Sequence, residues 1–265
     1  MRLNGAPGPN GLPGSVFRAN SRGWSSVLAP LYNACYLAAG VPHSWRGSLL
    51  CPIYKQGART GPRNYRLIAL LDLEAKGYAQ LLLNDLQVWV KENNILPAYQ
   101  TGFRPSASTI DNVVILAYLA HRATSIRQRP LYCCLVDYSA AFDNVDGNIL
   151  WKKLSEWGIP TGLLAAIKSL YSNTWVRVKL AKSFLTPEIK TSNGLKQCCV
   201  LAPLLFNLYM ADLGRSLDNA SLLTPKIGHT RLQILQYADD FIILDNTGVG
   251  LQRGLDALYY YNLNN

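Results

Sequence analysis

The chain has 265 residues, of which 49% are hydrophobic and 16% are charged, so it can bury a core and is not a disordered tail. Its 26 basic and 16 acidic residues give a net charge of +10, which favours a polyanionic partner, nucleic acid first and an anionic membrane surface second. The sequence contains no run of 18 apolar residues, so no transmembrane helix is predicted, and the N-terminus lacks the apolar core of a signal peptide. We therefore expect an intracellular protein, nuclear or cytoplasmic, without a membrane partner.

In chain order, the residue pattern predicts a mixture of helices and strands. The first 24 residues are rich in Gly, Pro, Ser and Asn and predict an extended lead-in. Apolar spacing and breakers predict helices over 25–40, 74–91, 108–122, 147–157, 161–171, 202–217 and 251–261. Strands are expected over 48–54, 65–71, 131–136, 175–180, 188–191, 234–236 and 241–244. Most strands therefore fall in the second half of the chain.

Two features of these elements carry further expectations. The loop between the first two strands is rich in Lys and Arg, which predicts a basic hairpin. Strand 131–136 is wholly apolar, which is typical of a strand buried on both faces. The six cysteines show no Cys-x-x-Cys spacing, so zinc binding is not predicted, and those in apolar runs, such as Cys133 and Cys134, are expected to be buried.

Adjacent carboxylates stand where the last two strands meet. A two-residue turn chosen for stability favours Asn-Gly or Asp-Gly, whereas Asp239 and Asp240 concentrate like charge. Such crowding raises carboxyl pKa values unless a cation compensates. An ordinary acidic turn is the plain interpretation of the dipeptide alone. The apolar strands on both sides place the pair at a sheet edge and favour a functional site.

A third carboxylate has the same setting, because Asp137 directly follows the apolar strand 131–136. Two strand systems that end in aspartate can set three carboxylates around one point. Mg²⁺ prefers such oxygen ligands and keeps water or phosphate oxygens in its other positions. Two such ions, about 3.5–4 Å apart, can activate a hydroxyl and stabilise the leaving oxygen of a phosphoryl transfer. Together with the positive net charge, this predicts nucleotidyl transfer on a nucleic acid.

At these residues the sequence resembles the reverse transcriptase domain of non-LTR (LINE-type) retrotransposons. The resemblance covers nearly the whole chain and rests on blocks that occur in the family's order. The blocks are APGPNGLP at 6–13, WRGSLLCPIYK at 45–55, NYRLIALL at 64–71, LVDYSAAFD at 135–143, GLKQCCVLAPLLFNLY at 194–209 and YADD at 237–240.

The resemblance implies an α+β fold with the fingers and palm of a right-hand polymerase. It implies an antiparallel palm sheet with helices packed on one face. Residues 1–130 would be mostly fingers and residues 131–265 mostly palm, with the helices after Phe142 reaching back toward the fingers. The thumb and endonuclease of the family are expected to be absent from this chain.

The family function is RNA-directed DNA polymerisation, in which a primer 3′-hydroxyl attacks the α-phosphate of a dNTP and pyrophosphate leaves. The implied partners are an RNA template, a DNA primer and dNTPs, and the oligomeric state is left open. Asp137 and Asp239 would ligate two Mg²⁺ ions, or Mn²⁺ in their place, with Asp240 completing the acidic cluster.

The resemblance also implies a nucleotide-binding set on other elements. Lys55 and Arg66 would hold the incoming triphosphate, since cationic donors suit a group with several negative charges. Phe142 would lie under the sugar and exclude a ribose 2′-hydroxyl. Gln197 would touch the template or the nascent base pair. As isolated residues, these would be surface charges, a core aromatic and an ordinary glutamine.

Three positions depart from the family pattern. Cys198 stands where glycine usually follows the glutamine, and glycine there permits φ values that a side chain resists. Leu67 replaces a proline, and Asn10 stands where aspartate is common. Two alternatives therefore remain, a decayed retroelement fragment that does not polymerise and a nucleic-acid-binding module without catalysis. An RNA-templated RNA polymerase fits less well, because Phe142 is expected to exclude ribose.

Overall fold

A computed structural model describes residues 6–104, 107–180 and 184–265 of the chain. The chain divides into two compact units, each assembled from two segments that are separate in the sequence. Unit 1 combines Met1–Trp89 with Phe142–Ala202, and unit 2 combines Val90–Ala141 with Pro203–Asn265. The expected division at residue 130 into fingers and palm stays a prediction, and the bounds of the two units differ from it.

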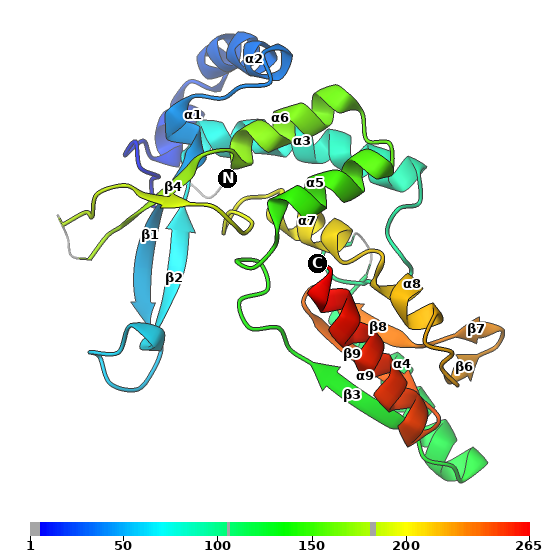
Figure 1. The fold of residues 1–265 in the computed structure, drawn as a ribbon. Helices are drawn as coiled ribbons and strands as arrows, with labels where there is room; N and C mark the ends of the chain where they lie inside the picture. The colour runs from blue at the N-terminus through cyan, green and yellow to red at the C-terminus, as the bar shows by residue number, and fades with distance from the viewer. Residues whose placement is uncertain (1–5, 105–106, 181–183) are drawn as a thin grey trace. The chain divides into compact units, whose positions relative to one another are not determined.

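Unit 1 contains a mixed four-stranded sheet in the order β2-β1-β4-β5. Strand β1 (Gly47–Tyr54) pairs antiparallel with β2 (Tyr65–Leu70) and parallel with β4 (Thr174–Val178), which pairs antiparallel with β5 (Ile189–Thr191). Figure 1 shows β1 and β2 as a long two-stranded ladder. The helical elements are α1 (Gly14–Ala19), α2 (Ser21–Leu37), η1 (His43–Arg46), η2 (Pro62–Asn64), α3 (Leu73–Glu92), α5 (Gly147–Glu156) and α6 (Thr161–Tyr171).

The helices of unit 1 form where apolar spacing and capping residues agree. Tyr78, Leu82 and Leu86 recur every four residues on α3, so they share one face, and all three are buried. Helix α5 begins after Asp146, whose carboxylate accepts a hydrogen bond from the Asn148 N–H at 2.7 Å. Helix α6 follows a short break and packs against α2.

The first segment is less extended than the sequence suggested. Residues 1–24 were expected to form an extended lead-in, but helix α1 begins at Gly14 and α2 at Ser21. The Asn20 side chain accepts a hydrogen bond from the Gly23 N–H at 2.9 Å, which starts α2 four residues before its expected position. The Asn20 cap therefore starts the helix despite the low helix propensity of the neighbouring glycine and serine residues.

Unit 2 is built on an antiparallel three-stranded sheet in the order β3-β9-β8. Its strands are β3 (Tyr132–Val136), β8 (Ile234–Tyr237) and β9 (Asp240–Asp245), and a separate hairpin joins β6 (Lys226–Ile227) to β7 (Thr230–Arg231). The helices are α4 (Thr109–His121), a π-helical turn η3 (Arg122–Arg127), α7 (Ala202–Tyr209), α8 (Leu213–Asp218) and α9 (Gly248–Leu263). The α+β class expected from the sequence is thereby confirmed.

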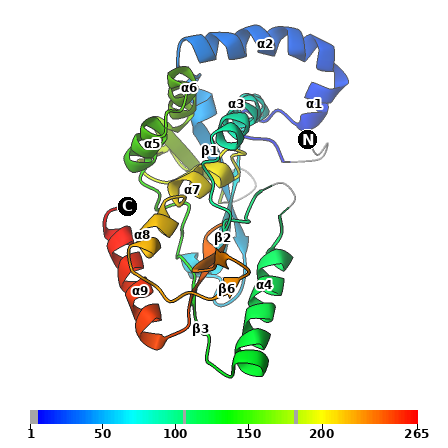
Figure 2. The ribbon, with the colours of Figure 1, turned by 90° about the vertical axis from the view of Figure 1, so that its right-hand side faces the viewer.

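Helices cover both faces of the β3-β9-β8 sheet, whereas the sequence predicted helices on one face. Leu119 of α4 packs with Leu235 and Leu244 in one apolar cluster. On the opposite face Gly254 of α9 lies against Ile243, where an added Cβ would be 3.1 Å from the Ile243 Cγ2 atom. Figure 2 shows α4 and α9 on either side of the strands. Both faces of β9 carry apolar side chains, so a helix packs on each face and shields those side chains from water.

Strand β3 corrects two sequence predictions. It was expected to be buried on both faces, but Leu135 is 76% exposed and Cys133 is also exposed. The strand lies at the edge of its sheet, and α4 covers the other edge strand, β8. Cys133 is exposed and Cys134 is half-buried, so the expectation of buried cysteines in this apolar run was also wrong.

The long helix expected over 202–217 is two helices, α7 and α8. Between them the backbone tightens, with the Ala211 N–H bonded to the Leu208 carbonyl and the Leu213 N–H bonded to the Met210 carbonyl. The Gly214 N–H then donates to the Tyr99 hydroxyl at 2.8 Å, a tertiary contact that apolar spacing cannot reveal. No helix in the described part of the chain has the length and apolar character needed to cross a membrane.

Candidate functional site

The paired aspartates lie on a tight turn between β8 and β9. Tyr237 pairs with Asp240, which leaves Ala238 and Asp239 as the two turn residues. Ala238 has φ of 58°, and Asp239 does not share this positive φ, which is the pattern of a type II′ turn. Ala238 is buried, whereas Asp240 is exposed. The backbone of the turn is therefore buried in unit 2 at Ala238, while the Asp240 carboxylate lies at the surface.

The third carboxylate reaches the same place through strand pairing. Strand β3 runs antiparallel to β9 with Val136 opposite Phe241, so continuing this register by one residue places Asp137 opposite Asp240. Partial burial raises the pKa of Asp240, and the negative charges of Asp239 and Asp137 raise it further. Unit 2 thus brings together the three aspartates that the sequence singled out.

These carboxylates suit a hard divalent cation by their chemistry. All their donor atoms are oxygens, and a bound cation would relieve the mutual repulsion that adds to the effect of burial on the pKa of Asp240. Across the described residues, no three His, Cys, Asp or Glu side chains already converge as ligands around one metal position. The donor set fits Mg²⁺ in type and charge.

The predicted template-contacting glutamine lies on a turn in unit 1. The Cys199 N–H donates to the Lys196 carbonyl at 3.1 Å, and Cys198 has φ of 60°, as at the third position of a type II turn. Glycine is favoured at that position, so the sequence expectation of an unusual φ there is confirmed. Gln197 donates from Nε2 to the Asp143 carboxylate, at 3.1 Å to Oδ1.

Lys196 anchors this turn, a role that its sequence context does not indicate. Its Nζ atom donates to the Trp45 carbonyl at 2.7 Å. Burial lowers the pKa of Lys196 to about 8, while the nearby Cys199 and Asp72 act in the opposite direction. Asp72 is itself 1% exposed and accepts from the Asn10 N–H at 3.0 Å. A lysine beside a motif glutamine gives no signal in the sequence that its side chain will be half-buried.

The other predicted nucleotide-binding residues also belong to unit 1. Lys55 continues the β1–β2 ladder, its N–H bonded to the Asn64 carbonyl at 2.8 Å, and Arg66 lies opposite Ile53. Strand alternation places Lys55 and Arg66 on the same face, and both are exposed. Phe142 is half-buried, and its carbonyl accepts from the Leu195 N–H at 2.8 Å. Their roles toward a nucleotide stay predictions.

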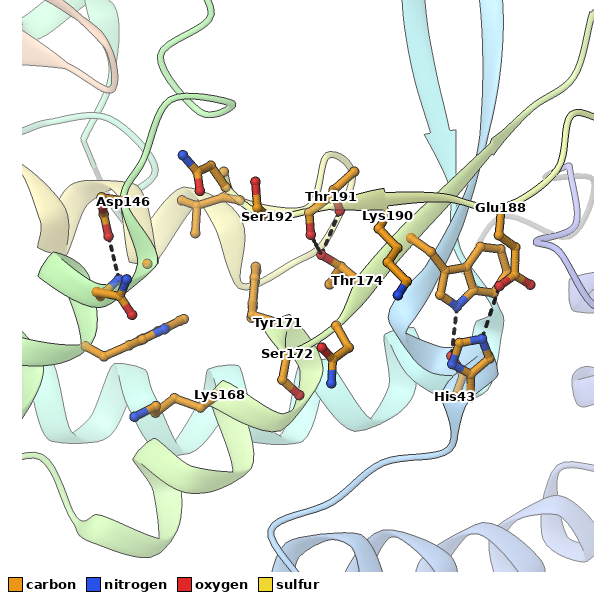
Figure 3. Close-up of a pocket in the computed structure, with 18 residues that line it drawn as sticks. His43, Asp146, Lys168, Tyr171, Ser172, Thr174, Glu188, Lys190, Thr191 and Ser192 are labelled. Atoms are coloured by element: carbon orange, nitrogen blue, oxygen red, sulfur yellow. Dashed lines mark hydrogen bonds and ion pairs between the residues drawn. The ribbon is translucent and has the colours of Figure 1, made fainter.

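Unit 1 also contains a polar cavity of about 640 Å³ between helices α5 and α6 and strands β4 and β5. Figure 3 shows Lys168, Tyr171 and Lys190 among its lining side chains. At one end Glu188 lies 3.4 Å from His43 Nε2 and 2.9 Å from Arg177 Nη2. None of the site residues predicted from the sequence lines this cavity.

Known proteins resemble this chain along most of its length. The family model described as "Reverse transcriptase (RNA-dependent DNA polymerase)" matches residues 53–261. A probable RNA-directed DNA polymerase from transposon BS of Drosophila melanogaster is 28% identical over 97% of this chain and 28% of its own length. The Pol polyprotein from the type-2 retrotransposable element R2DM, from the same organism, is 26% identical over 97% of this chain and 23% of its own length. The chain thus spans about a quarter of the length of these relatives.

Solved structures agree at the level of the fold. An apo telomerase from Candida tropicalis, truncated from its C-terminal domain, superposes with a TM-score of 0.57 at 13% identity, over 94% of this chain and 52% of that one. The match of the family model to most of the chain, together with relatives from retrotransposable elements, confirms the resemblance expected from the motif blocks. This chain belongs to the reverse transcriptase (RNA-dependent DNA polymerase) family.

Proposed function

We propose that this chain is the fingers and palm of an RNA-directed DNA polymerase that extends a DNA primer on an RNA template. The observation that carries the proposal is that Asp137, Asp239 and Asp240 lie at the same end of the β3-β9-β8 sheet, where their charges act on one another. A surface that concentrates negative charge in a chain of net charge +10 is suited to a cation-dependent reaction on a polyanion.

Asp137 and Asp239 would hold two Mg²⁺ ions, or Mn²⁺, with Asp240 beside them. When bound, the ions would activate the primer hydroxyl and stabilise the leaving pyrophosphate oxygen. Lys55 and Arg66, exposed on one face of the β1–β2 ladder, would bind the triphosphate of the dNTP. In this proposal unit 2 supplies the palm sheet, and the β1–β2 ladder of unit 1 supplies the fingers.

Phe142 and Gln197 would act on the nucleotide and the template. The Phe142 ring would lie under the sugar, and Gln197 would exchange its contact with Asp143 for one with the template or the new base pair. Gln197 donates to both Asp143 oxygens, at 3.1 and 3.3 Å. Since Asp143 is exposed, its carboxylate would be hydrated by water after the exchange and would not be left buried without a partner.

The test is single-nucleotide extension of a DNA primer on an RNA template with Mg²⁺ or Mn²⁺. Asp137→Asn and Asp239→Asn should each abolish extension, because the neutral amide keeps the shape of the side chain and removes the anionic ligand. Asp256→Asn is the matched control, since Asp256 is an exposed aspartate of α9 whose carboxylate contacts Gln252. Binding of the primer–template without extension by the unaltered chain would replace the proposal with nucleic-acid binding alone.

A further inference from the structure

A buried glutamine grips the turn that carries the carboxylates. Gln100 is 1% exposed, and its Oε1 atom accepts from the Ala238 N–H at 3.0 Å and from the Gly102 N–H at 2.8 Å. Its Nε2 atom lies 3.3 Å from the Ala238 carbonyl oxygen and donates to it. One side chain therefore binds both the N–H and the C=O of the first turn residue.

The orientation of this amide follows from its neighbours. The Ala238 and Gly102 N–H groups can only donate, so the atom facing both of them must be the oxygen of Gln100. The nitrogen is then left to face the Ala238 carbonyl. A carboxamide is a neutral side chain that offers an acceptor and a donor at one end, which an apolar side chain or a carboxylate does not.

The remaining contacts hold Gln100 and the turn in register. Gln236 Nε2 donates to the same Ala238 carbonyl at 2.9 Å, and the Thr101 N–H donates to the Gln236 carbonyl at 2.9 Å. Gly102 packs directly on the turn, since a Cβ added to it would be 2.2 Å from the Ala238 nitrogen. Asn207 Nδ2 donates to the Gly102 carbonyl at 2.7 Å, which fixes Gly102 from the side of α7.

The hydrogen bonds of Gln100 hold Ala238 in a backbone conformation that is strained. Ala238 has φ of 58°, a left-handed conformation that an L-residue with a Cβ rarely adopts. Strained residues persist where their surroundings over-determine them. Asp239 follows Ala238 directly, so a rotation of the Ala238 peptide changes the direction in which the Asp239 side chain leaves the turn.

We propose that Gln100 is a positioning residue for the carboxylate turn, setting the place of Asp239 and Asp240 through the Ala238 peptide. The inference rests on the proposed function, in which these aspartates bind the metal ions. Because the gripping groups are neutral amides, they hold the turn without adding charge to the acidic cluster.

The experiment compares the unaltered chain with Gln100→Met, which keeps the length of the side chain and removes both hydrogen-bonding groups. Mn²⁺ affinity is measured from the free Mn²⁺ signal in electron paramagnetic resonance, and kcat and KM for one dNTP are measured by primer extension. We expect Mn²⁺ affinity and kcat each to fall about tenfold or more, since a displacement of about 1 Å can cost on the order of 100-fold. The KM for dNTP should stay within about twofold, because Lys55 and Arg66 are untouched.

Two further variants separate positioning from general stability. Leu213→Ala opens a cavity in the core of unit 2 at a fully buried residue of α8 and should lower the melting temperature while leaving kcat and Mn²⁺ affinity near those of the unaltered chain. Gly102→Ala leaves the Gln100 amide in place but adds a Cβ that would clash with the Ala238 nitrogen. It should therefore displace the turn and reproduce the effect of Gln100→Met, and it replaces that variant in the test if Gln100→Met does not fold.

The outcomes distinguish this inference from the function on which it rests. A folded Gln100→Met or Gly102→Ala protein with unchanged kcat and Mn²⁺ affinity would overturn the positioning role alone. An equal loss of kcat in Leu213→Ala would do the same, since the effect would then be one of stability. An unaltered chain that neither binds Mn²⁺ nor extends a primer would reject the proposed function and this inference with it.

Discussion

Replacing Cys198 with glycine should raise both the stability of the protein and its rate of primer extension. Cys198 is exposed and has φ of 60°, so the substitution removes a strained Cβ and little packing. A left-handed φ costs an L-residue about 1–2 kcal/mol, and the greater chain entropy of unfolded glycine offsets about 0.5–1 kcal/mol of the gain. From the midpoints of these two ranges, the net stabilisation is about 0.75 kcal/mol. In a protein of this size it corresponds to about 1–4 °C in melting temperature.

The rate should rise because the same turn carries Gln197, which is proposed to contact the template or the new base pair. A Cβ at position 198 limits how closely the turn can approach a nucleotide, and glycine removes that limit. We expect kcat for primer extension to increase at least about threefold, a modest fraction of the roughly 100-fold that a displacement of about 1 Å can cost. The affinity for the primer–template should hardly change, since it rests on many phosphate contacts.

Two control variants test this reasoning. Cys198→Ala keeps the Cβ at the same φ, so thermal unfolding should show no gain. Ser221→Gly relieves a similar strain at an exposed position with φ of 53° in unit 2, and it should raise the melting temperature without changing kcat. The reasoning is refuted if Cys198→Ala stabilises the protein as much as Cys198→Gly, or if Cys198→Gly lowers the melting temperature.

Three other predictions concern the choice of sugar, the metal ions and the half-buried Lys196. Phe142→Ala should raise the use of ribonucleotides relative to deoxynucleotides in primer extension, and an unaltered ratio would show that the ring only packs. Mn²⁺ or Mg²⁺ should raise the melting temperature to a plateau, and Asp137→Ala with Asp239→Ala should remove this response, whereas persistence of the response would place the ion elsewhere. Lys196 has a folded pKa of about 8, lowered from 10.5, so the unfolded chain binds more protons between these values and Lys196 makes stability rise with pH there. The unfolding free energy of the unaltered chain minus that of Lys196→Met should therefore rise from pH 8 to pH 10, and a flat difference would contradict the lowered pKa of Lys196.

The carboxylate site was predictable because its signal is local. Asp137 follows one apolar strand, and Asp239 lies between two others. When these three strands pair antiparallel, the aspartates come to lie at the same end of the sheet. The unusual φ of Cys198 was also predictable, because the family pattern has glycine there and glycine marks such backbone.

What the sequence could not reveal depends on tertiary cover and on distant partners. Leu135 looks like a core residue by its type, yet it is exposed because its strand lies at the edge of the sheet. At the start of α8, just after the break from α7, Gly214 bonds to Tyr99, which lies more than a hundred residues earlier. Gln100 gave no signal, since a single glutamine in a polar loop does not show that its amide will be buried against a turn 138 residues later.

The interleaved segments of the two units have a consequence for how the protein folds. During synthesis Val90–Ala141 leaves the ribosome long before Pro203–Asn265, the segment with which it forms unit 2. Contacts between residues so distant in sequence are slow to form, because the closure of a long loop precedes any gain from the contact. Until β9 is made, β3 has no strand to pair with, and its apolar residues are open to association with other chains. We therefore expect refolding yield to fall steeply with protein concentration, and the carboxylate turn to be among the last parts of the molecule to reach its final geometry.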